Sequence, residues 1–247
     1  MKKYIIFNWK CNPSDWQEAK NLLTVIKSKP KFLKKYDVFV ATPFVYLEKL
    51  AKEKGIKTCA QDCFWEQEGP FTGEVSPLMI KNLDCDYVLL GHSERKRIFG
   101  ETERTINKKL KAVLDVGLCP ILFFGELKQM SQAAAKKEIV SQLGKLLAGV
   151  EKKFLSRILF VYEPAFAVST QGNKVLSSRR VKEKTGFIRR FLRQKFPFMP
   201  EILYGGSVDG SNIKDYLSRG GVEGVVVGQA SLNLKQVKKI ISAGLKE

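Results

Sequence analysis

The chain has 247 residues, 44% of them hydrophobic and 28% charged, and it carries a formal net charge of +18. This length and apolar content fit one large globular domain. No apolar stretch approaches the roughly 18 residues of a membrane-spanning helix. The four apolar residues after Lys2-Lys3 are too few for the core of a signal peptide. We therefore expect a cytoplasmic protein.

The charge comes from 43 lysines and arginines against 25 acidic residues. A basic surface is typical of nucleic-acid-binding proteins, and it can also steer an anionic substrate. The basic residues are spread over every predicted helical segment, which favours an ordinary solvated surface. We expect at most weak, non-specific binding of nucleic acid, as scattered lysines give.

Five scattered cysteines, Cys11, Cys59, Cys63, Cys85 and Cys119, agree with a reducing compartment. Cys59 and Cys63 are four residues apart. His92, however, is the only histidine, and no second cysteine pair follows, so the spacing does not match a metal site. We expect no metal.

Eight short apolar runs recur along the chain and predict β-strands. They lack polar alternation, as is typical of strands buried on both faces of a parallel sheet. In chain order the runs are Tyr4–Phe7, Val38–Ala41, Lys57–Ala60, Tyr87–Leu90, Ile121–Phe124, Ile158–Tyr162, Ile202–Tyr204 and Val225–Val227.

Segments with a helical period lie between the runs. Ser14 with Gln17 fits a capping box at the start of the first one. The apolar stripes are Trp16, Ala19, Leu22, Leu23, Ile26; Ile106, Leu110, Val113, Leu114; Ile139, Leu143, Leu146, Leu147, Val150; Val181, Ile188, Phe191, Leu192; and Leu234, Val237, Ile240, Ile241.

Strand and helix alternate eight times without a linker, which predicts an α/β fold with residues 1–247 as a single domain. Alternation alone also permits a doubly wound open sheet. Eight units in one undivided chain favour a closed (β/α)8 barrel of eight parallel strands surrounded by helices. The segment Asn8–Pro13 agrees, because it is not the Gly-rich fingerprint that opens a dinucleotide-binding sheet.

Polar residues and glycines follow the predicted strands, at the end where parallel barrels carry their active sites. Glycine turns after the seventh and eighth strands expose backbone N–H groups, and a short helix starting at Gln229 would add its dipole, which suits a phosphate. Each feature alone has an ordinary structural explanation, so only their joint position predicts a site. The segments are Asn8-Trp9-Lys10, Gln61-Asp62, Gly91-His92-Ser93-Glu94-Arg95, Gly125-Glu126, Glu163-Pro164, Gly205-Gly206-Ser207 and Gly228-Gln229.

Several of these segments resemble motifs of the triosephosphate isomerase family, in the order in which that family carries them. G-H-S-E-R at residues 91–95 and Y-G-G-S-V at residues 204–208 are together highly specific, whereas N-x-K at residues 8–10 alone is weak. The other matching segments are Gln61–Phe64, Gly69–Ser76 and Tyr162–Thr170.

The resemblance implies a TIM barrel that interconverts dihydroxyacetone phosphate and D-glyceraldehyde 3-phosphate in glycolysis and gluconeogenesis, without cofactor or metal. Glu163 would be the catalytic base, and His92, Lys10 and Asn8 would donate hydrogen bonds where enediolate charge develops. A neutral histidine whose pKa is lowered by a helix N-terminus is established for this family. Ser93 and the catalytic-site residue Glu94 would open that helix here.

The resemblance also implies how the substrate phosphate binds. Lys10 and Asn8 would contact the substrate, and backbone N–H groups of four residues would hold the phosphate. Those residues are Ser169, Ser207, Gly228 and Gln229.

Residues 64–77 form a long predicted loop that carries Phe64, Trp65 and Phe71. Exposed aromatic side chains on an irregular segment indicate a partner surface. The resemblance implies a homodimer in which this loop inserts near Cys11 and Lys10 of a second subunit. The alternative is a loop folded over its own barrel.

Six positions depart from the family pattern and leave lid closure, phosphate affinity and the subunit interface open. Two other functions also stay open: a basic nucleic-acid-binding barrel that has lost catalysis, and another phosphosugar isomerase. The departures are Phe166 for the usual lid tryptophan, Ser169 and Gln229 for glycines, Asp62 for asparagine, Phe124 for cysteine and Lys96 for arginine.

Overall fold

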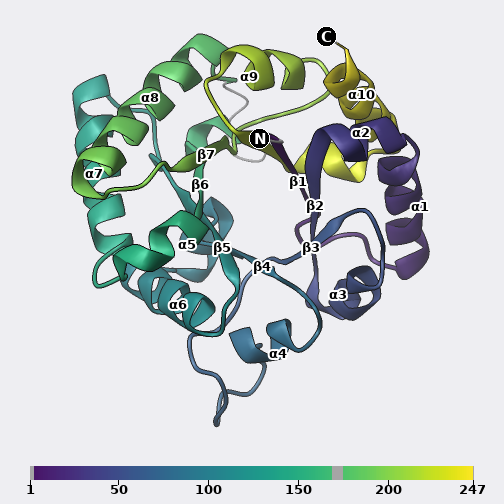
Figure 1. The fold of residues 1–247 in the computed structure, drawn as a ribbon, viewed down its shortest axis with the longest axis horizontal. Helices are drawn as coiled ribbons and strands as arrows, with labels where there is room; N and C mark the ends of the chain where they lie inside the picture. The colour runs from purple at the N-terminus through teal and green to yellow at the C-terminus, as the bar shows by residue number, and fades with distance from the viewer. Residues whose placement is uncertain (1–2, 169–174, 247) are drawn as a thin grey trace.

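A computed structural model describes residues 3–168 and 175–246. Its eight parallel strands form a closed barrel in which each strand pairs with the next and β8 pairs with β1 (Figure 1). The predicted (β/α)8 fold and all eight predicted strands are confirmed. The strands are β1 (Lys3–Asn8), β2 (Tyr36–Thr42), β3 (Lys57–Ala60), β4 (Tyr87–Leu90), β5 (Cys119–Phe124), β6 (Leu159–Tyr162), β7 (Glu201–Tyr204) and β8 (Gly224–Val227).

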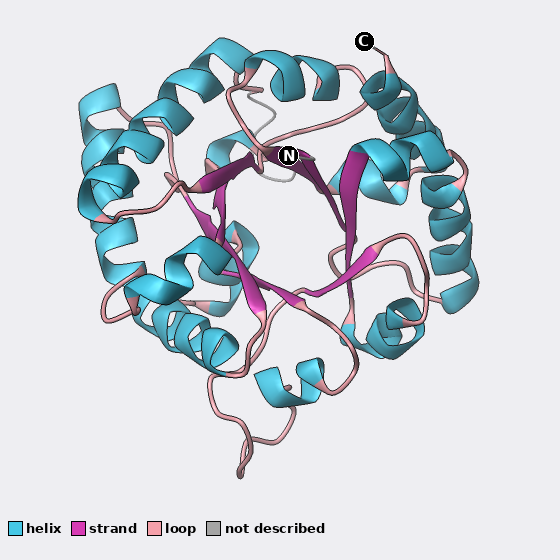
Figure 2. Cartoon of the chain, viewed as in Figure 1, coloured by secondary structure: helices cyan, strands magenta, loops and turns pink. Residues whose placement is uncertain are grey.

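Helices surround the barrel (Figure 2). The α-helices are α1 (Trp16–Lys27), α2 (Pro30–Lys35), α3 (Phe44–Ala51), α4 (Pro77–Lys81), α5 (Ser93–Phe99), α6 (Glu103–Asp115), α7 (Gln132–Leu146), α8 (Ser178–Lys195), α9 (Ile213–Arg219) and α10 (Leu234–Leu245). Short 3₁₀ helices are η1 (Lys152–Arg157), η2 (Ala165–Ala167) and η3 (Gln229–Leu232).

The predicted start of α1 is wrong by one residue. Asp15, not Ser14, caps this helix, and its carboxylate accepts a hydrogen bond from the N–H of Glu18 at 2.9 Å. A charged carboxylate is a stronger acceptor than a hydroxyl and also interacts favourably with the positive end of the helix dipole.

The strands contribute to two separate apolar cores, which explains why their sequences do not alternate with polar residues. Side chains such as Ile6, Leu89 and Val161 fill the inside of the barrel. Their neighbours Ile5, Leu90 and Phe160 point outward and pack with the apolar stripes of the helices. Every strand therefore buries both faces.

The segment between β3 and α4, residues 61–76, extends outward past the ring of helices in Figure 1. The expectation that all three of its aromatic side chains are exposed is wrong for Phe64, which is 9% exposed, and for Trp65, which is half-buried. The Phe64 ring packs against the tilted rings of Trp65 and Phe71, with centroid distances of 4.0 and 4.7 Å. Phe71 is 39% exposed and lies in the exposed stretch 66–74, which also contains three glutamates.

None of the helices that the structure describes is long and apolar enough to cross a membrane. All five cysteines carry free thiols. Within residues 3–168 and 175–246, no three histidine, cysteine or acidic side chains are grouped so as to hold a metal ion.

Candidate active site

A cavity of about 350 Å³ lies at the carboxyl ends of the strands. It brings together most of the site residues predicted from the sequence, which arrive from β1, β4, β6, β7 and β8. Ser169 lies outside the described residues. The residues of the prediction that line the cavity are Asn8, Lys10, His92, Glu163, Ser207, Gly228 and Gln229.

Three other polar residues at strand ends do not line this cavity. Glu94 instead forms an ion pair with Lys10, which does line the cavity. Asp62 belongs to a buried charge network, and Glu126 faces a different hollow on the outer side of the barrel.

The loop after β1 holds Lys10 in a strained conformation. Its φ of 54° lies in the left-handed region that non-glycine residues seldom adopt. The Asn8 side chain accepts the Lys10 N–H at 3.0 Å, and Ser231 Oγ donates to the Asn8 carbonyl at 3.1 Å. These bonds direct the Lys10 ammonium toward Glu94 and the cavity.

His92 follows β4 and forms the N-cap of α5. Its Nδ1 accepts the Glu94 N–H at 3.2 Å, which requires that Nδ1 carry no proton. The imidazole proton therefore lies on Nε2, the nitrogen that points to Glu163 Oε1 at 3.0 Å. A neutral histidine presents this N–H to the cavity.

Glu163 lies at the end of β6, where it is 4% exposed. One of its oxygens accepts the Ser93 N–H at 2.9 Å, and the other faces His92. The N-terminus of α5 thus stabilises the carboxylate.

Burial lowers the pKa of His92, but the nearby carboxylates of Glu163 and Glu94 outweigh burial and raise it above the ordinary value. The family resemblance implies a lowered pKa for this histidine, and that expectation is wrong for the arrangement in this structure, because the two carboxylates together outweigh burial and the Lys10 ammonium.

The turn after β7 packs directly on the Glu163 side chain. A Cβ at Gly205 would lie 2.8 Å from Val161 and 3.3 Å from Glu163, so this position has no room for a side chain. The N–H and Oγ of Ser207 both donate to the Ala167 carbonyl at 2.8 Å. The Ser207 N–H therefore already has an acceptor within the protein.

The turn after β8 contains Gly228, where a Cβ would lie 3.3 Å from Lys10 Cε. Glycine at this position leaves room for the lysine beside the proposed phosphate site. Gln229 begins η3, as expected from the sequence, and its side chain is exposed. The cavity is therefore not blocked by this departure from the family pattern.

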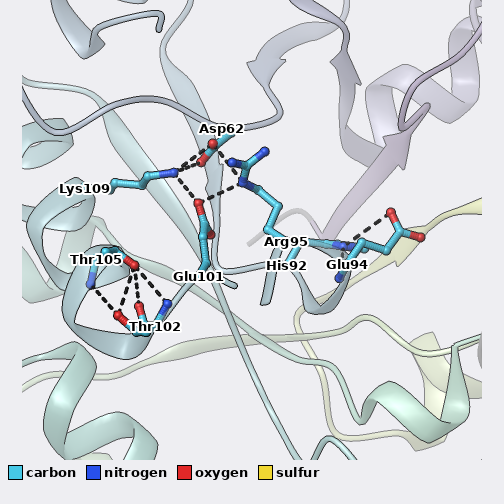
Figure 3. A network of polar contacts seen from close by, with 8 residues as sticks. All are labelled: Asp62, His92, Glu94, Arg95, Glu101, Thr102, Thr105 and Lys109. Atoms are coloured by element: carbon cyan, nitrogen blue, oxygen red, sulfur yellow. Dashed lines mark hydrogen bonds and ion pairs between the residues drawn. The ribbon is translucent and has the colours of Figure 1, made fainter. Parts of the chain in front are cut away.

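A buried charge network that the sequence did not predict supports α5 (Figure 3). Arg95 Nε contacts Asp62 and Glu101 at 2.9 and 2.8 Å, and Lys109 Nζ contacts both oxygens of Asp62 at 2.8 Å and also binds Glu101. Arg95 lies in the first turn of α5, so the network fixes the helix that positions His92 and Glu163.

The pKa values of the two carboxyl groups in the network, Asp62 and Glu101, shift in opposite directions, although both groups contact the same cations. Burial and the neighbouring Glu101 raise the pKa of Asp62 to about 6, against the opposing effect of Lys109 and Arg95. For Glu101, burial also raises the pKa, but its bonds to Lys109 and Arg95 outweigh burial and lower it. One sequence signal was available: Lys109 falls on the apolar face of α6, where a lysine requires a buried partner.

A second missed residue, Gln142, holds the loop after β5. Its side chain accepts the Gly125 N–H and donates to the Gly125 carbonyl, both at 3.0 Å. The segment that follows Glu163 is fixed to the same loop, because the Ala165 N–H donates to the Glu126 carbonyl at 2.9 Å. Gln142 interrupts the apolar stripe of α7, which was the signal in the sequence.

A parallel barrel with a buried carboxylate, a neutral histidine and a lysine around one glycine-lined cavity defines an enzyme that moves protons on a small anionic substrate. The family model for triosephosphate isomerase matches residues 3–244. The chain belongs to the triosephosphate isomerase family, and it is an isomerase.

The sequences of individual relatives align with most or almost all of the chain. The triosephosphate isomerase of Dictyoglomus thermophilum is 34% identical over 250 residues, which cover 98% of this chain and 99% of the relative. The Aquifex aeolicus protein of the same name is 36% identical over 248 residues, covering 98% and 99%. That of Trichlorobacter lovleyi is 39% identical over 217 residues, covering 85% and 86%.

Proposed function

We propose that this chain interconverts dihydroxyacetone phosphate and D-glyceraldehyde 3-phosphate through an enediolate. The observation that carries the proposal is the meeting of Glu163 Oε1 and His92 Nε2 at 3.0 Å in the wall of one cavity. A base and a hydrogen-bond donor that converge in this way can act on neighbouring atoms of one substrate.

In this reaction the Glu163 carboxylate removes a proton from the carbon beside the carbonyl. The electron pair moves onto the carbonyl oxygen, where the His92 Nε2–H and the Lys10 ammonium stabilise the developing charge. The hydroxyl proton on the first carbon passes to the former carbonyl oxygen, and Glu163 returns its proton to the neighbouring carbon, so that the carbonyl is now on the first carbon. Asn8 contributes by fixing the Lys10 backbone through its side-chain bond at 3.0 Å.

We assign the phosphate to the glycine turns after β7 and β8, with Lys10 adding positive charge. Backbone N–H groups of Ser207, Gly228 and Gln229 are the proposed donors, and all three residues line the cavity. The role of Ser169 stays a prediction from the family resemblance.

The experiment is a coupled assay with each triose phosphate, in both directions, on the wild type and Glu163→Gln. The glutamine keeps the shape but removes the base, so we expect activity to fall at least ~10²-fold, the lower end for a positioned base. Glu151→Gln, at an exposed position, is the control and should keep full activity. Near-normal turnover of Glu163→Gln would assign the base elsewhere.

The same assay separates the alternatives. A barrel that had lost catalysis would convert neither triose phosphate. Another phosphosugar isomerase would prefer a longer sugar phosphate, whereas a cavity of about 350 Å³ suits a small substrate.

We also propose a homodimer formed through residues 64–77, acting in the cytoplasm. The exposed Phe71 at the tip of the outward segment and the exposed Met79 on α4 supply an apolar surface. The free thiols agree with a reducing compartment.

Replacing Trp65 and Phe71 by serine should give monomers with weak activity. Light scattering and the coupled assay at one protein concentration test this. Leu127→Ser, at an apolar position that is 54% exposed on another loop, is the control. A double variant that remains dimeric would refute the role of the loop.

A further inference from the structure

The loop that follows β5 supports the segment that carries Glu163. The Glu163 N–H donates to the Phe124 carbonyl at 2.9 Å. The Ala165 N–H donates to the Glu126 carbonyl, also at 2.9 Å. Between these two bonds the backbones are in direct contact, because a Cβ at Gly125 would lie only 2.4 Å from the Glu163 carbonyl oxygen. A movement of this loop therefore displaces the backbone of Glu163.

The side chain of Glu126 anchors this loop in the protein interior, where it is 2% exposed. Its Oε1 accepts a hydrogen bond from Lys184 Nζ at 2.7 Å, and the Lys184 side chain is itself only 19% exposed. Within residues 3–168 and 175–246, no other cation pairs with Glu126. A carboxylate that is removed from water to this extent requires a cation to compensate its charge.

Two helices hold the loop from outside the barrel, and they pack against each other (Figure 1). From α7, the Gln142 side chain bonds to both the N–H and the carbonyl of Gly125 at 3.0 Å. From α8, Lys184 binds the side chain of the next residue, Glu126. The bonds of Gln142 join neutral groups, so the compensation of the buried charge comes from Lys184.

The Glu126 carboxylate also faces Tyr162, the residue that precedes Glu163 in the sequence. Tyr162 is fully buried, and its burial, together with the Glu126 carboxylate, raises the pKa of its hydroxyl. The hydroxyl therefore keeps its proton and can donate a hydrogen bond to Glu126. Lys184, Glu126 and Tyr162 thus form a buried row of polar groups that ends one residue before Glu163.

We propose that Lys184 is a positioning residue for the catalytic base. By compensating the charge of Glu126 it fixes the loop after β5, and this loop fixes the backbone of Glu163. Lys184 is not among the described residues that line the active-site cavity, so it acts on the reaction only through Glu126. This role rests on the proposed isomerase function, in which Glu163 is the base.

The test is steady-state kinetics of Lys184→Met in the coupled assay, with each triose phosphate. Methionine keeps the apolar part of the side chain but leaves Glu126 uncompensated, so the loop has to move toward water. We expect kcat to fall at least about tenfold, since a small displacement of a catalytic group is costly, and KM to change less than about twofold. Lys182→Met, at an exposed position of the same helix, is the matched control and should keep the wild-type kcat.

Two further variants separate positioning from a loss of structure. Lys184→Arg keeps the cation and should retain kcat within about threefold. Adding Glu126→Gln to Lys184→Met removes the uncompensated charge and should raise kcat several-fold again. Unfolding temperatures show that each variant is folded under the assay conditions. If Lys184→Met does not fold, Lys184→Gln takes its place with the same expectation, because its amide can bond to Glu126 without supplying a charge.

An unchanged kcat in Lys184→Met, or an effect confined to KM, would overturn the positioning role and leave the isomerase function standing. A double variant as slow as Lys184→Met would also overturn it, because the charge of Glu126 would then not be the link. A wild type that converts neither triose phosphate would refute the proposed function itself, and the positioning role with it.

Discussion

Lys109→Met removes the central cation of the buried network and leaves an apolar side chain of similar length. In the wild type the Lys109 side chain is 4% exposed and holds two carboxylates, Asp62 and Glu101, whose side chains are 11% and 7% exposed. In the variant these carboxylates share Arg95 alone, which is the more exposed cation at 31%. Two buried negative charges then face each other without adequate compensation.

The expected loss of unfolding free energy follows from the burial of these charges. Removing one partner of a buried ion pair costs about 3–5 kcal/mol of unfolding free energy, because the other charge stays buried. Asp62 already has a pKa raised to about 6, mainly by burial. Without Lys109, the pKa values of both carboxyl groups rise further in the folded state, while those of the unfolded chain do not change.

The sign of the pH dependence is therefore fixed. A carboxyl group with a raised folded-state pKa binds its proton more tightly in the folded protein, so folding is favoured as the pH falls through that pKa. The loss of unfolding free energy caused by Lys109→Met should be largest at about pH 8.5. It should shrink as the pH falls toward about 6, the pKa of Asp62 in the wild type.

Urea unfolding measures this difference in unfolding free energy between the variant and the wild type. It is carried out at one protein concentration and at several pH values in this window. Lys137→Met, at an exposed position of α7, is the matched control and should stay within about 0.5 kcal/mol of the wild type. Adding Asp62→Asn to Lys109→Met should recover part of the loss, because one uncompensated charge is gone. A deficit below about 1 kcal/mol, or one that does not change with pH, would refute this account of the network.

Three further changes test the site. His92→Ala should lower kcat much more than it changes KM, because its hydrogen bond strengthens as the enediolate forms; a change in KM alone would make it a binding residue. Gly125→Ala should lower kcat at least about tenfold, because the new Cβ would lie 2.4 Å from the Glu163 carbonyl at a φ of 154°. Gly144→Ala, with no atom within 4 Å, is its control, and equal activity of the two variants would contradict the prediction. Gln229→Gly should lower KM a few-fold, by about 1 kcal/mol or less, with kcat little changed, because a glycine lets the backbone approach the phosphate more closely; weaker competition by inorganic phosphate would instead make Gln229 a ligand.

The strands could be predicted from the sequence because each one contains a local, mostly apolar run of three to five residues. The spacing of apolar residues was too weak a signal to predict the shorter helices. In α3 the buried side chains are Tyr46, Leu47 and Leu50, and α9 buries Ile213, Tyr216 and Leu217. So few apolar positions in one or two turns do not establish a helical period, and only packing against the barrel fixes these helices.

The sequence by itself determined the barrel and which residues follow its strands, because both depend on short stretches of neighbouring residues. The tertiary structure decided which of those residues meet. Asn8, His92 and Glu163 share one cavity, whereas Glu126 faces the outer hollow. Lys109 meets Asp62 across 47 positions of the chain. The direction in which a side chain points after a strand depends on turns and partners that lie far away in the sequence, and only the closed barrel brings these together.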